Sequence, residues 1–166
     1  MVRLRPMIFG GLVTVIGLGV VLYFFPSEER KIKRQFRSLA EWVSKEAGEN
    51  PITMAYKIKK IETLFDGRCE FGIPQYSFSG SFTPEEIIGY VTRGRISFSK
   101  LHIKFFDLQI VFPEREMAKV TLTAKVTGKS NTGEQIDEAH ELESLLKKAG
   151  KEWFFSKFET VEVLKK

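Results

Sequence analysis

The spacing of apolar residues changes once along this chain, near Gly94, and this change constrains the fold more than any other feature. Before Gly94, apolar residues recur every three or four positions, as they do on one face of a helix. After Gly94 they recur at every second position, as they do in a strand with one buried face. A group of helices followed by a group of long strands predicts an α+β domain.

Three helices are predicted from their start signals. Ser27 can cap a helix that carries Glu28 and Glu29 in its first turn, where acidic residues are favourable. Asn50-Pro51 places a capping residue before a proline at the first helical position. Thr83-Pro84-Glu85-Glu86 is a capping box. We expect these helices to end near Gly48, Gly67 and Gly94.

The remaining segments predict strands. A short extended piece covers residues 68–73, and a long strand covers 96–112, in which the apolar side switches as a β-bulge would make it do. A half-buried strand follows over residues 118–126, then a polar loop over 128–134. Residues 135–148 fit either a helix or a strand. The glycine-containing turn after them favours a strand over residues 138–148 that pairs with the final alternating run.

Residues 7–25 contain no charged side chain, and as a helix they would be about 28 Å long, close to the thickness of a bilayer core. A cleaved signal peptide would need small residues at a cleavage site, which the bulky end of this run lacks. A buried soluble helix would not favour the four glycines of the run. We therefore expect residues 1–26 to form a single transmembrane anchor and residues 27–166 to form the folded domain.

The anchor predicts a single-pass membrane protein whose partner is the lipid bilayer through residues 7–25. The orientation of the anchor stays open. The Lys and Arg residues between Arg30 and Arg37 outnumber Arg3 and Arg5, which favours a cytoplasmic domain. A short basic N-terminus before an apolar run is also typical of a signal anchor, which exports the domain. We expect an exported domain, either periplasmic or extracellular.

Charge and composition exclude several classes. Arg3 and Arg5 account for part of the net charge of +5, so residues 27–166 hold 24 basic and 21 acidic side chains. This near balance argues against a nucleic-acid partner. One cysteine rules out a disulfide scaffold, and a hydrophobic content of 43% rules out a disordered chain.

Motifs for metals and cofactors are absent. The sequence has no cysteine pair, no His-Glu-x-x-His and no aspartate-rich loop, so we expect no bound metal. It also has no glycine-rich loop that would hold a phosphate, so we expect no cofactor.

Three pieces of sequence carry a resemblance to a known family. They are Leu64-Phe65-Asp66-Gly67, the stretch from Ser79 to Ile87, and the stretch from Leu145 to Trp153. With the order of helices and strands, they resemble the nuclear-transport-factor-2-like superfamily, including its SnoaL-like branch. The resemblance covers about residues 28–165. It implies a cystatin-like fold in which a curved, mostly antiparallel sheet wraps around helices and forms a cone with an apolar pocket.

No catalytic set of the family maps onto this sequence. His140 shares a strand face with Leu142 and Leu146, so it is the one candidate for a catalytic base, although a histidine on an apolar face is more often structural. Glu138, Glu141 and Glu143 are interpreted as a solvated or dimer-facing set. The candidate pocket-lining residues are Tyr56, Phe65, Tyr90, His140, Leu142 and Trp153.

These observations lead to a first hypothesis of a membrane-anchored, noncatalytic binding or assembly module. Its apolar pocket or sheet face would hold an apolar small molecule or a partner, and the sheet could also form a homodimer. The alternative is a SnoaL-like isomerase, cyclase or hydrolase that uses His140 with a carboxylate. If His140 and a carboxylate meet in an accessible cavity, the enzyme hypothesis gains. A cavity lined only by Phe, Leu and Ile would exclude it.

Overall fold

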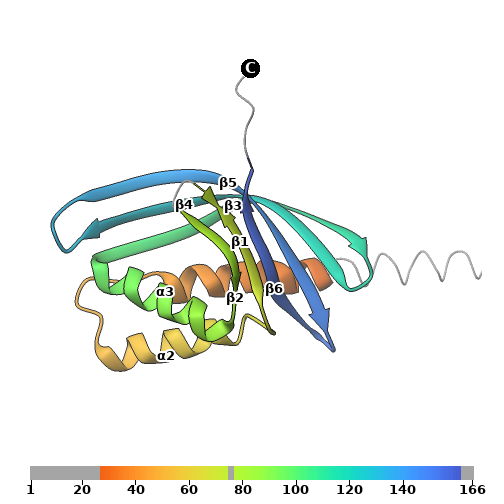
Figure 1. Ribbon diagram of the computed structural model, residues 1–166, viewed down its shortest axis with the longest axis horizontal. Helices are drawn as coiled ribbons and strands as arrows, with labels where there is room; N and C mark the ends of the chain where they lie inside the picture. Colours follow the sequence, from red (N-terminus) through yellow and green to blue (C-terminus); the bar gives the residue numbers. More distant parts are fainter. Residues whose placement is uncertain (1–26, 75–76, 162–166) are drawn as a thin grey trace, which may run out of the picture.

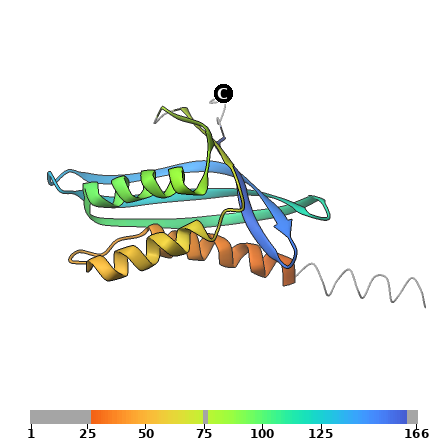
Figure 2. The same cartoon turned by 60° about the horizontal axis from the view of Figure 1, so that its bottom comes forward.

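Three helices lie against the inner face of a curved sheet (Figure 1). The computed structural model describes residues 27–74 and 77–161. The first helix is described over residues 27–43, and it is followed by α2 (Pro51–Glu62) and α3 (Pro84–Ser97). Figure 2 shows the helices together on one side of the long strands. The predicted α+β class is confirmed.

The sheet has the strand order β2-β1-β6-β5-β4-β3. Neighbouring strands are antiparallel except for β1 and β6, which are parallel. The strand predicted over residues 138–148 is present and begins three residues earlier, at Gln135, whereas β2 was not predicted. The strands are β1 (Cys69–Ile73), β2 (Phe78–Phe82), β3 (Phe98–Glu114), β4 (Met117–Ser130), β5 (Gln135–Ala149) and β6 (Glu152–Thr160).

The predicted helix caps of α2 and α3 are present. The side chain of Asn50 accepts a hydrogen bond from the backbone N–H of Thr53 at 2.8 Å. Thr83 and Glu86 form the reciprocal capping box at the start of α3. The predicted end of α3 at Gly94 is wrong, because the helix continues to Ser97. A glycine inside a helix destabilises the helix by only about 1 kcal/mol relative to alanine. The next residue, Arg95, is fully buried and holds the last turn in place.

The switch of apolar side predicted in the long strand is a β-bulge in β3. The pairing of β3 with β4 shifts register between Phe106 and Gln109. Asp107 at the bulge has a φ of 54°, the left-handed conformation that Asp tolerates better than most residues. Because side chains alternate along a strand, one extra residue returns Leu108 to the inner face that Phe105 occupies before the bulge.

The core lies between the helices and the inner face of the sheet. The 27–43 helix buries Ile32 and Phe36 completely or nearly so, and β4 buries Val120 and Leu122 opposite them. The ring of Phe36 packs edge-on against Phe155 of β6, with their centroids 5.0 Å apart. This packing joins the first described helix to the last strand.

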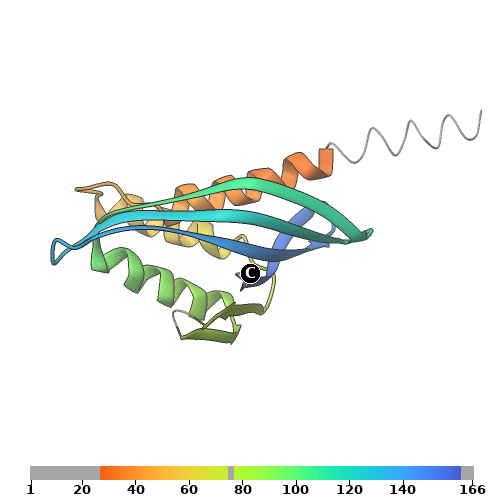
Figure 3. The same ribbon diagram turned by 90° about the horizontal axis from the view of Figure 1, so that it is seen from above.

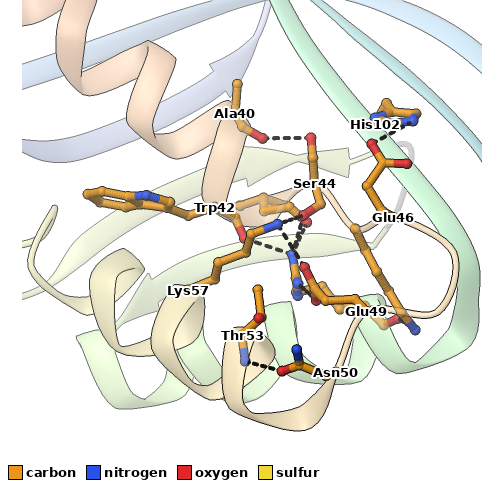
Figure 4. Close-up of polar contacts among 12 residues, drawn as sticks. Ala40, Trp42, Ser44, Glu46, Glu49, Asn50, Thr53, Lys57 and His102 are labelled. Atoms are coloured by element: carbon orange, nitrogen blue, oxygen red, sulfur yellow. Dashed lines mark hydrogen bonds and ion pairs between the residues drawn. The ribbon is translucent and has the colours of Figure 1, made fainter.

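A buried guanidinium closes the C-terminal end of the 27–43 helix. The Arg95 side chain is 0% exposed, and its Nη1 donates to the backbone carbonyls of Trp42, Val43 and Ser44 at 2.6–2.7 Å. These carbonyls belong to the helix end that lacks partners within the helix and carries partial negative charge. Figure 4 shows this end of the helix with the polar groups that surround it.

Glu49 completes this cluster between the three helices. Its carboxylate pairs with Arg95 and lies 2.7 Å from the ammonium of Lys57 on α2, which also donates to the carbonyl of Ser44. Burial alone would raise the pKa of Glu49. The hydrogen bonds and positive charges of Lys57 and Arg95 outweigh burial and hold the pKa below its ordinary value.

The opposite end of the 27–43 helix is tied to the sheet by a second carboxylate. Glu28 accepts a hydrogen bond from the indole Nε1 of Trp153 at 2.7 Å and pairs with Lys31 and Lys148, each at 3.0 Å. Burial would raise the pKa of Glu28, but these three donors lower it below its ordinary value. Both ends of the described part of this helix are therefore held by charged groups, with Phe36 between them.

The prediction of a single-pass membrane protein with an exported domain is contradicted. None of the helices in residues 27–74 and 77–161 is long and apolar enough to cross a membrane. Residues 7–25, on which the predicted anchor rested, lie outside the described residues.

Replacing Arg95 with methionine (Arg95→Met) should destabilise the domain by about 3–5 kcal/mol, because it removes one of the two cations that pair with the buried Glu49 carboxylate and leaves the carbonyls of Trp42 and Val43 without this donor. Urea unfolding followed by circular dichroism measures this change. The matched control is Arg93→Met on the same helix, where the exposed guanidinium only stacks on Tyr90, a contact worth up to about 1 kcal/mol. Equal losses in the two variants would contradict a structural role for the buried guanidinium.

The lowered pKa of Glu49 predicts a loss of stability in acid. A carboxyl with a lowered pKa in the folded state stabilises the fold above its unfolded pKa, and this contribution disappears as the pH falls through the folded pKa. The unfolding free energy of the native protein should therefore fall more steeply below about pH 5 than that of Glu49→Gln. Urea unfolding at several pH values between about 2 and 7 tests this prediction. The control is Glu41→Gln, because Glu41 is exposed to solvent. Parallel curves for native protein and Glu49→Gln would contradict the prediction.

Candidate functional site

The inner face of β5 changes from polar to apolar along the strand. Alternate residues of a strand share one face, so Glu138, His140, Leu142, Ser144 and Leu146 all face inward. Glu138 is exposed and His140 is partly exposed, whereas Ser144 and Leu146 are fully buried. Opposite them, β4 places Ala124 beside His140 and Val126 beside Glu138. The strand therefore leads from an open, polar end into the core.

Two adjoining cavities lie along this face. The inner cavity has a volume of about 230 Å³ and is lined by apolar residues of the 27–43 helix, α2, α3 and the sheet. The outer cavity has a volume of about 340 Å³ and is lined by Glu138, His140 and Thr160 among apolar residues. The two cavities share four wall residues, so they adjoin along this face of the sheet. These shared residues are Ile73, Ala124, Val126 and Leu142.

A histidine and a carboxylate meet in the outer cavity. The Nε2 of His140 lies 3.3 Å from Oε2 of Glu138. The His140 side chain is 30% exposed, so it can reach both solvent and a molecule inside the cavity. Because both side chains stand on the same face two positions apart, the strand geometry itself brings them together.

The structure separates the three glutamates that were interpreted as one solvated or dimer-facing set, although Glu138 is exposed as that interpretation expects. This residue faces the cavity, whereas Glu141 and Glu143 belong to the opposite face of β5, where Glu143 pairs with Lys119 at 2.6 Å. The sequence held the signal, since Glu138 stands two positions before His140. Interpreting the three glutamates as one set overlooked their spacing. Glu138 and Glu141 are three positions apart, so they lie on opposite faces of the strand.

Three of the six candidate lining residues contact the cavities, and three lie elsewhere. Phe65 and Leu142 line the inner cavity, and His140 with Leu142 lines the outer one. Tyr56 is 59% exposed on α2, and Tyr90 is 43% exposed beside Phe78 and Phe82 of β2. Trp153 is buried against Phe112 at the other end of the sheet.

Among residues 27–74 and 77–161, the buried cysteine and the acidic groups do not form a second chemical site. Cys69 is fully buried, and its burial, with the nearby charge of Glu70, raises the pKa of the thiol to about 12. A thiol that stays protonated is a poor nucleophile. Within the part of the chain that the structure describes, no three His, Cys, Asp or Glu side chains gather as a metal site would require.

The cavity can therefore perform two kinds of task. Its apolar walls can take up a small molecule by removing apolar surface from water. The imidazole of His140, placed beside a carboxylate, can also accept a proton from a molecule held in the cavity. Glu138 would orient the imidazole and stabilise its positive charge after proton transfer.

Comparison with known proteins identifies the fold. No protein-family model matches the chain, and no curated protein matches it. Solved structures match it over most of their length. The hexachlorocyclohexane dehydrochlorinase LinA-type3 from Novosphingobium barchaimii shares 12% identity at a TM-score of 0.65, and the match covers 81% of this chain and 86% of that protein.

Two further matches extend this likeness. Kfla4162 from Kribbella flavida has a TM-score of 0.69 at 7% identity, covering 82% of this chain and 90% of that one. A conserved protein from Planctomyces limnophilus has a TM-score of 0.65 at 14% identity, covering 81% and 97% of the two chains. The curved mixed sheet and three helices, together with these solved structures, fit the nuclear-transport-factor-2-like cone fold. At these identities the likeness concerns the fold, and function must be argued from the site.

Proposed function

We propose that this domain binds a small apolar molecule in the cavity between its helices and the inner face of its sheet. The observation that carries the proposal is the inner cavity, whose lining consists entirely of apolar residues and which adjoins the more polar outer cavity. Pockets for small molecules are typically apolar, with a few polar groups that fix orientation. His140, Glu138 and Thr160 in the outer cavity supply such groups.

The opposite face of the sheet is less suited to an apolar ligand. It carries ion pairs between neighbouring strands, including Lys119 with Glu143 at 2.6 Å and Lys125 with Asp137 at 3.0 Å. Covering these charged groups would remove them from water at a cost that their pairing only partly offsets. The apolar surface that favours ligand binding is therefore inside the cone.

Filling the cavity should abolish this binding. Val126 lines both cavities and is only partly buried, so Val126→Phe narrows both with a side chain that suits a strand. Titration with the neutral fluorescent probe N-phenyl-1-naphthylamine should give saturable binding to the native protein. The variant should bind at least about tenfold more weakly.

The matched control for the filled cavity is Thr121→Phe. Thr121 stands on the same strand, on the opposite face, and is exposed. This variant should bind the probe as the native protein does, and thermal unfolding should show both variants folded. Unchanged binding by Val126→Phe, or an equal loss in Thr121→Phe, would refute binding in the cavity.

A second candidate function is proton abstraction from a molecule held in the cavity, as in an elimination or isomerisation. It is favoured by the 3.3 Å approach of His140 and Glu138 at the wall of the outer cavity. LinA-type3, which shares the fold, is a dehydrochlorinase. In such a reaction His140 would take the proton from carbon while the carbon–leaving-group bond breaks, and Glu138 would position the imidazole.

The ring opening of 5-nitrobenzisoxazole tests this second function. A base removes the ring C–H proton as the N–O bond breaks, and the phenolate product is measured by absorbance. The native protein should accelerate the reaction by about 10²-fold or more over His140→Gln. His102→Gln is the matched control, because His102 also lies near a carboxylate, 3.6 Å from Glu46, but does not line the cavity. Equal rates for the native protein and His140→Gln would leave binding as the function of the cavity.

A further inference from the structure

A second hollow, outside the cone, runs between the 27–43 helix and the free edge of β3. It has a volume of about 480 Å³, and Figure 3 shows the helix lying along this edge of the sheet. Ile103 and Phe105 line both this groove and the inner cavity, so their side chains contribute to the wall between the two. The groove is therefore separate from the outer cavity at His140.

The edge of β3 offers backbone groups to the groove. β3 is the last strand of the sheet, and on its free side Leu101 exchanges hydrogen bonds with Lys45 at 2.7 and 2.9 Å. Two residues further, the N–H of Ile103 donates to the hydroxyl of Ser44 at 3.0 Å. Backbone groups of alternate residues face the same edge of a strand. The N–H of Phe105 therefore faces the groove as a donor, and the bulge at Asp107 interrupts the edge just beyond it.

Three cationic side chains line the groove, and no acidic side chain does. Lys33 and Arg37 lie one turn apart on the helix, and Lys104 comes from β3. All three are exposed. Lys33 makes a long ion pair of 3.8 Å with Glu29. Neither Arg37 nor Lys104 pairs with a carboxylate in the described ranges 27–74 and 77–161.

The rest of the groove is apolar. Its surface is formed by Phe36 and Ala40 of the helix and by Leu108 of β3, together with Ile103 and Phe105. Phe106 adds an aromatic ring that is 44% exposed. An apolar surface with cations on its rim complements a molecule that has an apolar tail and one negative charge.

We propose that this groove binds a medium-chain alkyl carboxylate. The tail lies on Ala40, Phe105 and Leu108, and the carboxylate sits among Lys33, Arg37 and Lys104. Arg can bind a carboxylate through two parallel hydrogen bonds, which favours this head group. The proposal is independent of the ligand and the reaction proposed for the cavity inside the cone.

Isothermal titration calorimetry with decanoate, below its micelle concentration, tests the proposal on the 166-residue chain. Decanoate should bind more tightly than octanoate by about threefold or more for each added methylene. Acetate should not bind measurably, and decanol should bind at least tenfold more weakly than decanoate. Equal affinity for decanol and decanoate would overturn the proposal, because the cations would then have no role.

Charge reversal locates the site. The double variant Arg37→Glu/Lys104→Glu should weaken decanoate binding at least tenfold. The control Lys59→Glu/Lys129→Glu makes the same change of net charge at exposed positions on α2 and β4, and its affinity should stay within about twofold of native. Equal weakening in both double variants would indicate attraction to net charge alone and would overturn a specific site.

Two further variants keep the test decisive if charge reversal disturbs folding. Ala40→Leu fills the groove without changing charge and should weaken decanoate binding at least tenfold. Val126→Phe, which fills the inner cavity, should leave decanoate binding unchanged. The reverse pattern would place decanoate in the cone and overturn the proposal for the groove, while leaving the function proposed for the cone intact.

Discussion

The buried guanidinium of Arg95 is the contact on which the arrangement of the helices depends. Arg95 lies in the last turn of α3 and donates to the carbonyls at the end of the 27–43 helix. Glu49 pairs with both Arg95 and Lys57, so the same cluster also includes α2. Three helices that share one charged cluster cannot shift independently of one another. The inner cavity is bounded by these helices on one side and by the sheet on the other.

The inner face of the long strand β5 changes from polar at one end to apolar at the other. Polar groups of the outer cavity and apolar groups inside belong to the same face of this strand, so a ligand would lose water progressively as it enters. His140 stands where that change occurs, beside Glu138 and close to Leu142. The groove outside β3 has the opposite character, since its cations remain in solvent and its wall is shared with the cavity through Ile103 and Phe105.

Much of the fold could be predicted from the sequence because its signals are local. Asn50 and Thr83 mark helix starts by capping, and the switch of apolar side around Phe106 marks the bulge. β2 (Phe78–Phe82) was not predicted, because it is short and contains a glycine. It is a strand through its pairing with β1, which the local sequence does not indicate. The role of Arg95 could not be predicted, since its partners lie about fifty residues away in the chain. Within the site, alternation placed His140 correctly relative to Leu142 but was not applied to Glu138.

The position of β6 in the sheet has a consequence for the order in which the protein is built. β6 lies between β1 and β5 and pairs with both, so the β1–β2 hairpin has no neighbouring strand until β6 has been synthesised. A ribosome makes the chain from its N-terminus, and pairing across such sequence distances is slow. Phe71 and Ile73 of β1 line the inner cavity. The inner cavity should therefore be among the last parts of this domain to form.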